Sequence, residues 1–293
     1  MGRTIGVLAT RYIWVGAVEG GKLGSVRMYP EPGRGDVDLR SLPPDEIVAR
    51  ICGEIAVLRQ GGAVDSVGAG FPGIVRRGVI AEAPNLGQLK GLHIEERLSA
   101  ALKADGLDAP VTVVNSADAL AAGIAVTRGV YESLIRVWSL GDGIGFGRYP
   151  RGEGVWEAGH SVVTLDPKER FCACGGVGHL EGIMGNRAMR LRFLDMEPEE
   201  VFAAARYGDA RSGEFVKVWH RALAAATATS VHLEGPGRFY IAGPNSDFVD
   251  LGLLGMYVQD MVKMTPLQGT FFEIVQTSHD LALIGAAVSG ERR

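Results

Sequence analysis

The sequence of 293 residues has few cysteines, no long apolar segment and no excess of basic charge. Its three cysteines do not form a disulfide framework, because Cys172 and Cys174 are separated by one residue and Cys52 stands far away. No run reaches the roughly 18 apolar residues that a transmembrane helix needs. The formal net charge of −4 gives no reason to expect a nucleic-acid or membrane-surface partner.

The N-terminal segment is also unlike a targeting sequence. Its first apolar run, residues 5–8, is too short for a signal peptide, so we expect a cytoplasmic protein. Apolar residues make up 46% of the chain and charged residues 22%, which is typical of a soluble globular protein. A chain of this length can bury a large core and often forms two domains.

Apolar patterning in the first half predicts a β-meander followed by α/β units. Three short apolar runs open the chain, and a glycine pair separates the second from the third, as in consecutive hairpins. Ser116 is the expected N-cap of a helix rich in small residues. The predicted strands cover residues 5–8, 12–18, 23–28, 64–70 and 111–115, and the predicted helices cover residues 44–60, 94–104 and 117–126.

The second half begins again with a hairpin and continues with helices. The predicted strands cover residues 133–140, 144–149, 238–242 and 271–276, and the helices residues 180–194, 198–206, 213–233, 248–262 and 279–288. The repeat at about half the chain length predicts two similar α/β domains with a cleft between them. We expect residues 1–117 and 279–293 to form one domain and residues 118–278 the other.

Two motifs in the second half carry a family resemblance. Residues 157–160 read Glu-Ala-Gly-His, and residues 172–181 read Cys-Ala-Cys-Gly-Gly-Val-Gly-His-Leu-Glu. Together they resemble the signature of the ROK family of sugar kinases and sugar-responsive repressors, E-x-G-H followed by C-x-C-G-x-x-G-C-x-E. The resemblance extends over essentially the whole chain. It implies two actin-like, hexokinase-like (ribonuclease H-type) α/β domains around a central cleft.

The resemblance implies a structural zinc ion in the segment of residues 160–181. The family ligands are one histidine and three cysteines, which map to His160, Cys172, Cys174 and, in place of the last cysteine, His179. Zinc accepts thiolate and imidazole ligands interchangeably in tetrahedral structural sites, so this Cys₂His₂ set is chemically sound. The alternative is that His179 is an ordinary loop histidine and that no metal binds.

The same segment supplies the sugar contacts of the family. The resemblance assigns hydrogen bonds to sugar hydroxyls to Glu157, His160 and Glu181, and further contacts to Asn115 and Gly73. Carboxylates suit this task because each accepts several O–H bonds. His160 would then use one ring nitrogen for zinc and the other for the sugar. The alternative for the two glutamates is that they are solvated surface carboxylates.

The catalytic base of the family is missing. In ROK kinases an aspartate follows the sugar-binding asparagine and accepts the proton of the attacking hydroxyl, but here Ser116 follows Asn115. A serine hydroxyl has no useful basicity near neutral pH. Asp118 and Asp142 are the carboxylates that could substitute, although we expect Asp118 to point elsewhere from within the helix.

Both phosphate loops also depart from the family pattern. The first, D-x-G-G-T in the family, is Gly-Val-Leu-Ala-Thr at residues 6–10 and keeps only Thr10. The second places Asp142 where a phosphate-binding hydroxyl is usual, although Asp142 could simply form a tight turn. The resemblance implies ATP with Mg²⁺, and these losses argue against it. The remaining loop glycines are Gly141, Gly143, Gly145 and Gly243.

These departures leave several functions open. The first is a ROK protein that binds a hexose or amino sugar but transfers phosphate poorly or not at all. The second is an active ATP-dependent kinase of glucokinase type with Asp118 or Asp142 as base, and the third is another reaction that pairs two of Asp118, Asp142 and Glu157. A repressor is not expected, because the first strand leaves no room for a helix-turn-helix before it. Trp156 could stack on the sugar or fill the cleft, and the resemblance implies a homodimer.

Overall fold

The computed structural model describes residues 3–31, 37–131, 134–152, 154, 157–276 and 278–291. Trp156 lies outside the described residues. The chain divides into two compact units, both of mixed α/β structure, as the sequence predicts. The first unit comprises Met1–Ser133, Gly147–Trp156 and Thr277–Arg293, and the second comprises Leu134–Phe146 and Glu157–Gln276. The domain limits expected from the sequence stay a prediction.

The first unit is built on a five-stranded sheet in the order β3-β2-β1-β4-β7. The predicted meander is confirmed, because β1, β2 and β3 pair antiparallel, whereas β4 lies parallel to β1 and β7 lies parallel to β4. The elements are β1 (Arg3–Ala9), β2 (Ile13–Glu19), β3 (Lys22–Tyr29), η1 (Leu39–Ser41), α1 (Pro44–Arg59), β4 (Ser66–Phe71), β5 (Ile74–Arg76), β6 (Val79–Glu82), η2 (Gly87–Leu89), α2 (Ile94–Ala104), β7 (Val111–Asn115), α3 (Ser116–Arg128) and α9 (Ser278–Glu291).

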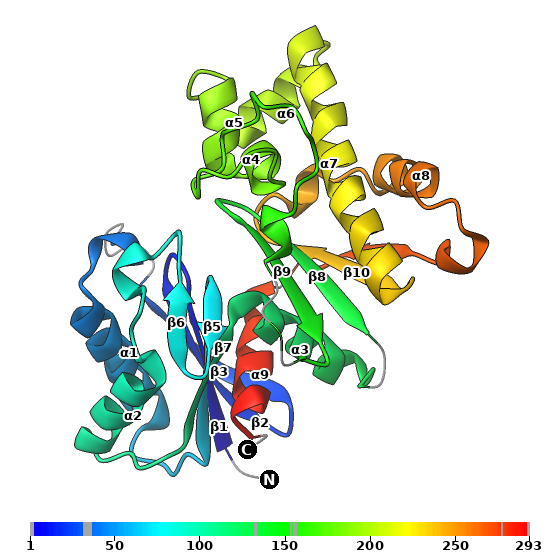
Figure 1. Cartoon of the computed structure of the whole chain (residues 1–293). Helices are drawn as coiled ribbons and strands as arrows, with labels where there is room; N and C mark the ends of the chain where they lie inside the picture. The colour runs from blue at the N-terminus through cyan, green and yellow to red at the C-terminus, as the bar shows by residue number, and fades with distance from the viewer. Residues whose placement is uncertain are drawn as a thin grey trace. The chain divides into compact units, whose positions relative to one another are not determined.

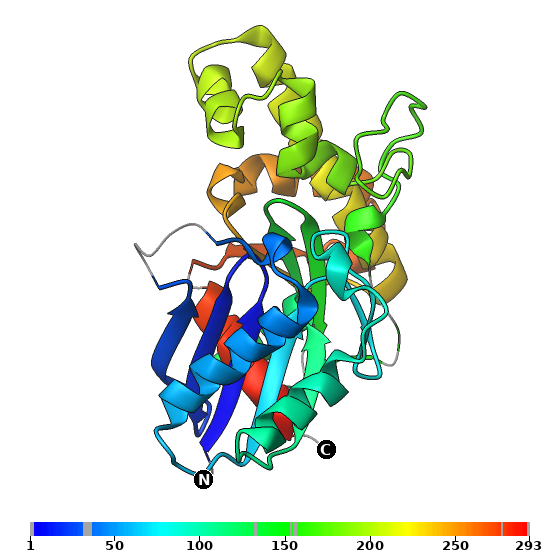
Figure 2. The same ribbon diagram turned by 90° about the vertical axis from the view of Figure 1, so that its left-hand side faces the viewer.

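Helices cover both faces of this sheet, with α1 and α2 on one face and α9 beside α3 on the other (Figures 1 and 2). The contact with α9 is unusually close. A Cβ atom at Gly6 would lie 2.0 Å from the carbonyl oxygen of Leu283, and one at Gly68 would lie 1.7 Å from that of Ala286. Because only glycine fits beside the α9 backbone, these strand positions serve packing.

The second unit has a four-stranded sheet in the order β11-β10-β8-β9, on which α7 packs. In the core Trp138 of β8 donates its indole N–H to Thr227 of α7 at 3.1 Å. Its elements are β8 (Ile135–Leu140), β9 (Ile144–Tyr149, the end of which belongs to the first unit), η3 (Ala158–His160), α4 (Glu181–Met184), α5 (Asn186–Arg192), α6 (Pro198–Arg206), α7 (Ala210–Glu234), β10 (Arg238–Ala242), η4 (Ser246–Phe248), α8 (Leu251–Met261), η5 (Thr265–Leu267) and β11 (Phe271–Ile274).

Two sequence expectations about local structure were wrong. The helix predicted over residues 180–194 is two helices, because Gly185 between α4 and α5 has extended backbone dihedral angles (φ −69°, ψ 147°). The hairpin of β5 and β6 was not predicted, since its strands are only three and four residues long. None of the helices in the described ranges combines the length and apolar character needed to cross a membrane.

Candidate functional site

The four predicted zinc ligands lie together in the second unit. His160 ends the short helix η3, and Cys172 and Cys174 follow in a turn. His179 forms an isolated bridge with Val162 just before α4 begins. Two backbone hydrogen bonds hold this bridge, from Val163 N to Gly178 O at 2.8 Å and from Leu180 N to Ser161 O at 2.9 Å. Three separate pieces of chain therefore bring their side chains to one point.

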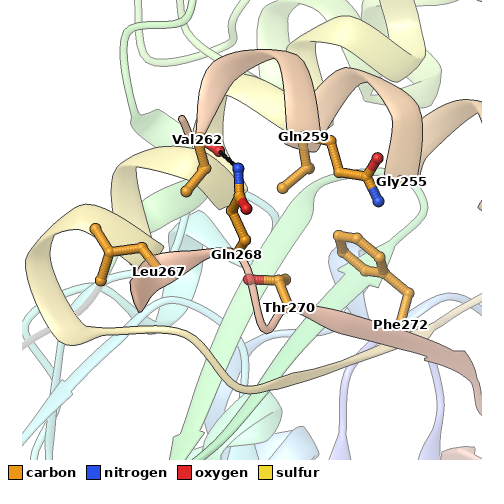
Figure 3. A pocket seen from close by; sticks show the side chains of 8 residues that line it. Gly255, Gln259, Val262, Leu267, Gln268, Thr270 and Phe272 are labelled. Carbon is orange, nitrogen blue, oxygen red and sulfur yellow. Dashed lines mark hydrogen bonds between the residues drawn. The ribbon is translucent and has the colours of Figure 1, made fainter. Parts of the chain in front are cut away.

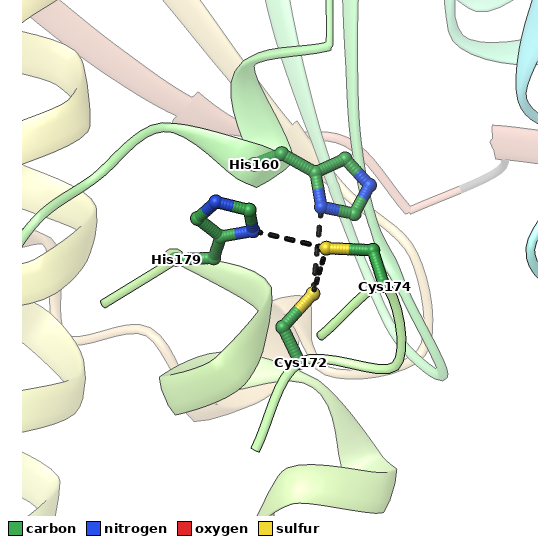
Figure 4. Close-up of side chains that lie close together, drawn as sticks. All are labelled: His160, Cys172, Cys174 and His179. Atoms are coloured by element: carbon green, nitrogen blue, oxygen red, sulfur yellow. Dashed lines mark hydrogen bonds between the residues drawn. The ribbon is translucent and has the colours of Figure 1, made fainter. Parts of the chain in front are cut away.

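The geometry of the four side chains fits one tetrahedral ion (Figure 4). Nδ1 of His160 lies 3.4 Å from Sγ of Cys172, the two sulfur atoms are 3.3 Å apart, and Nδ1 of His179 lies 3.2 Å from Sγ of Cys174. All four donor atoms lie within 4.8 Å of one another. Zinc–ligand bonds of about 2.0–2.3 Å imply donor separations of about 3.3–3.8 Å, so a small adjustment would satisfy the ion.

Charge and packing agree with this donor set. Burial keeps the pKa of the His179 imidazole below its usual value, and the neutral ring is the form that binds a metal. Burial likewise raises the pKa of the Cys172 thiol to about 12, so a cation is needed to hold the thiolate there. A Cβ at Gly176 would lie 2.0 Å from the His179 ring, so this turn accepts a histidine only because residue 176 is a glycine.

The two predicted sugar-binding glutamates flank the zinc ligands. Glu181, the first residue of α4, accepts a hydrogen bond from Ile144 N at 3.0 Å through Oε2, and its Oε1 lies 3.7 Å from Sγ of Cys172. Glu157 is half-buried, and its carbonyl oxygen accepts the His160 N–H at 2.9 Å. Because an ionised carboxylate has about four acceptor positions, both side chains retain capacity for ligand hydroxyls.

In the first unit Asn115, a predicted sugar contact, also caps a helix. Its Oδ1 accepts from the backbone N–H groups of Ala117 and Asp118 at 2.7 and 3.3 Å, and its Nδ2 donates to the Gly73 carbonyl at 2.7 Å. Asn115, not Ser116, is therefore the N-cap of α3, which corrects the sequence expectation. An asparagine side chain reaches the second and third N–H groups of the helix, while Ser116 already forms its first residue.

The position expected for the catalytic base lies close to Gly70 of β4. A Cβ at Gly70 would lie 3.4 Å from the Cα of Ser116, 3.5 Å from the Leu8 side chain and 3.5 Å from Ala119. Asp118 is turned away, as predicted, because its Oδ1 accepts a hydrogen bond from Arg148 N at 3.0 Å. Residues two apart on a helix differ by about 200° around its axis, so Ser116 and Asp118 occupy opposite sides of α3.

The first predicted phosphate loop is not a loop over most of its length. Residues Gly6 to Ala9 lie within β1, and the connection to β2 is Thr10, Arg11 and Tyr12, which corrects the expectation. This connection contains no glycine, and its Thr10 N–H donates to the Tyr12 carbonyl at 3.1 Å. Arg11 forms an ion pair with Asp38, at 3.4 Å.

The second predicted phosphate loop is a tight turn between β8 and β9. Gly141 N donates to Gly143 O at 3.2 Å, and Asp142 between them is exposed. Oδ1 of Asp142 accepts from Nδ2 of Asn186 at 3.0 Å, and Asn186 in turn accepts from Asn245 at 2.6 Å. An amide network thus holds the carboxylate on the turn.

The other two glycines of this region differ in their surroundings. Gly243 follows β10 with φ +92°, and a Cβ there would lie 2.4 Å from the Leu140 carbonyl oxygen. Gly145 lies within β9. Gly243 is thus required by packing at the end of β8.

Sequence reasoning missed three residues that shape these sites. Leu8 lies beside Gly70, as does Ser116, Asn186 holds the Asp142 carboxylate, and Gly176 makes room for the His179 ring. The glycine could have been noticed, because it stands between two predicted ligands. No pattern in the sequence links Leu8 or Asn186 to residues that are distant along the chain.

A small cavity elsewhere in the second unit is not a candidate for the sugar site. It lies under α8 and is lined by Gln259, Gln268, Thr270 and Phe272, among others (Figure 3). Its volume of about 30 Å³ suits one or two water molecules, whereas small-molecule pockets usually enclose about 300–1,000 Å³. The hydroxyl of Thr270, which has no hydrogen-bond partner within the described part of the chain, is a suitable neighbour for such a water.

Comparisons with known proteins agree with this arrangement. Residues 43–289 match the model of the ROK family. The glucokinase of Pyrobaculum calidifontis is 29% identical over 253 residues, which is 80% of this chain and 81% of that protein. Among solved structures, the ROK hexokinase of Thermus thermophilus superposes with a TM-score of 0.78 at 22% identity, covering 99% of this chain and 98% of that chain. The ROK glucokinase of Streptomyces griseus in complex with glucose and AMPPNP gives 0.71 at 24% identity, covering all of both chains.

Proposed function

Because the chain belongs to the ROK family and is sugar-kinase-like, we propose that it binds a hexose or an amino sugar and transfers phosphate poorly or not at all. The observation that carries this proposal is Ser116, the first residue of α3, at the position that the family resemblance assigns to the base. A kinase of this type needs a carboxylate to accept the proton of the attacking hydroxyl. Asp118 is a poor substitute, because it bonds the Arg148 backbone on the other side of the helix.

The two phosphate-loop regions support the same conclusion. The connection after β1 lacks glycine, and one of its N–H groups is already bonded within the turn, so it offers little to a phosphate. Asp142 adds a negative charge to the turn after β8, which opposes the binding of a polyanion unless a metal intervenes. Arg11 is a cation of the first connection, but it is paired with Asp38.

The proposed sugar contacts are Glu157, His160 and Glu181 of the second unit, with Asn115 and Gly73 of the first as further ones. His160 directs Nδ1 to the cysteines, which leaves Nε2 for a ligand hydroxyl. A zinc ion, when bound, would lock the orientation of this ring. Glu181 is held on its other side by the Ile144 backbone, so its carboxylate is pre-positioned.

A second candidate is an active ATP-dependent glucokinase that uses a displaced carboxylate. The similarity to the Pyrobaculum enzyme favours it, because that relative is named as a glucokinase. The two candidates differ in nucleotide binding. An active kinase must bind ATP with Mg²⁺, whereas the proposed protein needs only the sugar.

A thermal-shift screen of the purified chain separates them. Hexoses and N-acetylhexosamines should raise the melting temperature, because a ligand that binds only the native state stabilises it by RT ln(1 + [L]/Kd). ATP with Mg²⁺ should leave the melting temperature unchanged, alone or with sugar. Stabilisation by ATP would favour the glucokinase, and no effect of any sugar would contradict both. The expected homodimer stays a prediction, which light scattering after gel filtration tests.

A further inference from the structure

The first unit contains a cavity that the proposed function does not use. It lies where β7, the edge strand of the sheet, meets α3, the end of α9 and residues 148–151. Its volume is about 310 Å³, at the lower end of the range of about 300–1,000 Å³ for small-molecule pockets. Asp118 lines it, so it lies on the side of α3 away from Ser116.

One wall of the cavity carries a hydroxyl that lacks a partner. The Oγ1 of Thr112 is buried and makes no hydrogen bond to any residue that the structure describes. Most buried hydroxyl groups are paired, with protein or with another molecule, because desolvation of an unpaired one is unfavourable. Ser289 lies in the same wall and donates to the Gly285 carbonyl at 2.7 Å, which leaves its oxygen free to accept. The two groups offer one donor and one acceptor.

The charged residues of the lining carry more positive than negative charge. Arg148 and Arg151 both line the cavity, against the single carboxylate of Asp118. That carboxylate is partly used, because Oδ1 accepts the Arg148 backbone N–H at 3.0 Å and Oδ2 lies 4.0 Å from Nε of Arg151, beyond hydrogen-bond distance. Burial raises the pKa of Asp118, while the hydrogen bond from the Arg148 backbone and the charges of the two arginines act in the opposite direction.

We propose that this cavity binds a small anionic metabolite, whose carboxylate or phosphate group contacts Arg148 and Arg151 and whose polar group contacts Thr112. Guanidinium groups match the planar and tetrahedral oxyanions through paired N–H donors. Arg151 is 42% exposed at the mouth, so it can close on a ligand without displacing the core. Val114 and Val288 form the apolar part of the lining, and the volume limits the ligand to a single ring or a short chain.

Titration calorimetry of the full chain tests the proposal with three probes, inorganic phosphate, glucose 6-phosphate and malonate. Uncharged glucose is the matched comparison for the sugar phosphate. At least one anion should bind, and Arg151→Gln should weaken it about tenfold or more, the usual effect of losing a charged hydrogen bond. Arg97→Gln, which removes an equally exposed arginine of α2, should leave the affinity unchanged.

Two further variants keep the result interpretable. Thr112→Val keeps the shape of the side chain and should weaken binding several-fold, while Ala122→Leu should fill the cavity and abolish it. Unchanged melting temperatures confirm that the Arg151 and Thr112 variants fold. The proposal is overturned if none of the three anions binds, or if Arg151→Gln and Arg97→Gln have the same effect. It does not rest on the proposed sugar binding, because uncharged glucose reports on that site separately.

Discussion

The signature segment of the second unit, residues 157–181, and the start of α3 in the first unit differ in how their polar groups are used. In the signature segment four donor atoms converge within 4.8 Å, and Glu181 beside them is oriented by a backbone N–H. At the start of α3, Ser116 stands at the position that the family resemblance assigns to the catalytic base. Under the proposed function, the signature segment keeps the side chains that bind, and the start of α3 lacks the side chain that reacts.

Under the proposed function, this difference means that catalysis is lost in this fold while binding is kept. The polar residues of the signature segment support each other, so removing one affects several. Asn115 caps α3 and bonds the Gly73 carbonyl, so its side chain has a structural task that does not depend on phosphoryl transfer.

The largest expected effect concerns phosphoryl transfer, which tests the first unit. We expect turnover near background with glucose, mannose or their N-acetyl forms, because general-base assistance alone contributes ~10²–10⁴-fold. Ser116→Asp should recover little, since the connection of residues 10–12 and Asp142 still oppose ATP. A coupled ADP-release assay measures both. Turnover on the order of 1 s⁻¹ in the unmodified chain would show that the start of α3 still supports phosphoryl transfer, and it would contradict the proposed function.

A combined variant sharpens the same test. Ser116→Asp together with Asp142→Thr and a Gly-Gly-Thr connection at residues 10–12 should recover more than the separate gains multiplied, because such groups act as a unit. Gly6→Asp is the matched negative control. Its side chain would collide with the Leu283 carbonyl, so it should lower the melting temperature and restore no activity.

The next largest effect concerns the metal in the second unit. We expect about one zinc ion per chain by elemental analysis and its loss in Cys174→Ser. At zinc concentrations about a thousandfold above Kd, the lost ion would cost about 4 kcal/mol of the free energy of unfolding.

Cys52→Ala is the control for this prediction. Cys52 is a buried thiol of α1, and it is not among the four side chains that converge at the predicted metal site. The variant should keep its zinc. A metal-free preparation of the unmodified chain with an unchanged melting temperature would show that the cluster binds no structural ion.

Much of the fold could be predicted from the sequence, because long elements carry strong periodic signals. The predicted limits of α2 and α6 agree with the structure, and α9 is found where a terminal helix was expected. The helix predicted over residues 180–194 is interrupted at Gly185, whose backbone is extended. The sequence does not reveal this, because glycine can adopt helical or extended backbone angles and its neighbours favour a helix. The meander was predicted, but the exact end of β1 was not, because β1 continues through residues 6–9 that were expected in a loop.

The candidate site was predicted unevenly for a similar reason. The predicted zinc ligands follow a spaced motif, and the structure brings all four side chains together. The N-cap was assigned to Ser116 because serine and asparagine have similar capping preferences, and only the backbone geometry separates them. Contacts between distant residues, such as those of Asp118 with Arg148 or of Leu8 with Gly70, depend on the tertiary fold.

A smaller effect is expected for the two glutamates of the signature segment. Glu157→Gln and Glu181→Gln should each weaken sugar binding by about 1–3 kcal/mol, the scale of a hydrogen bond to a charged group. Glu199→Gln, at an exposed position of α6, is the control and should change nothing. Calorimetry with the best sugar of the screen measures this. Equal affinity in all three variants would mean that the sugar contacts lie elsewhere.

The smallest effect concerns Asp118, whose role separates a structural carboxylate from a catalytic one. Burial raises the pKa of Asp118 above the ordinary 3.8. At a pH between the ordinary and the raised value, the folded chain therefore holds a proton that the unfolded chain has released. Stability that Asp118 contributes is therefore complete below the ordinary value and is lost as the pH rises through the raised pKa. Asp118→Asn still accepts the Arg148 N–H but does not titrate. The free energy of unfolding of the unmodified chain, from urea melts, should thus fall relative to this variant between acid and neutral pH. A constant difference in the free energy of unfolding between the two chains across that range would show that folding does not raise the pKa of Asp118. A loss of turnover in Asp118→Asn would identify Asp118 as the displaced base.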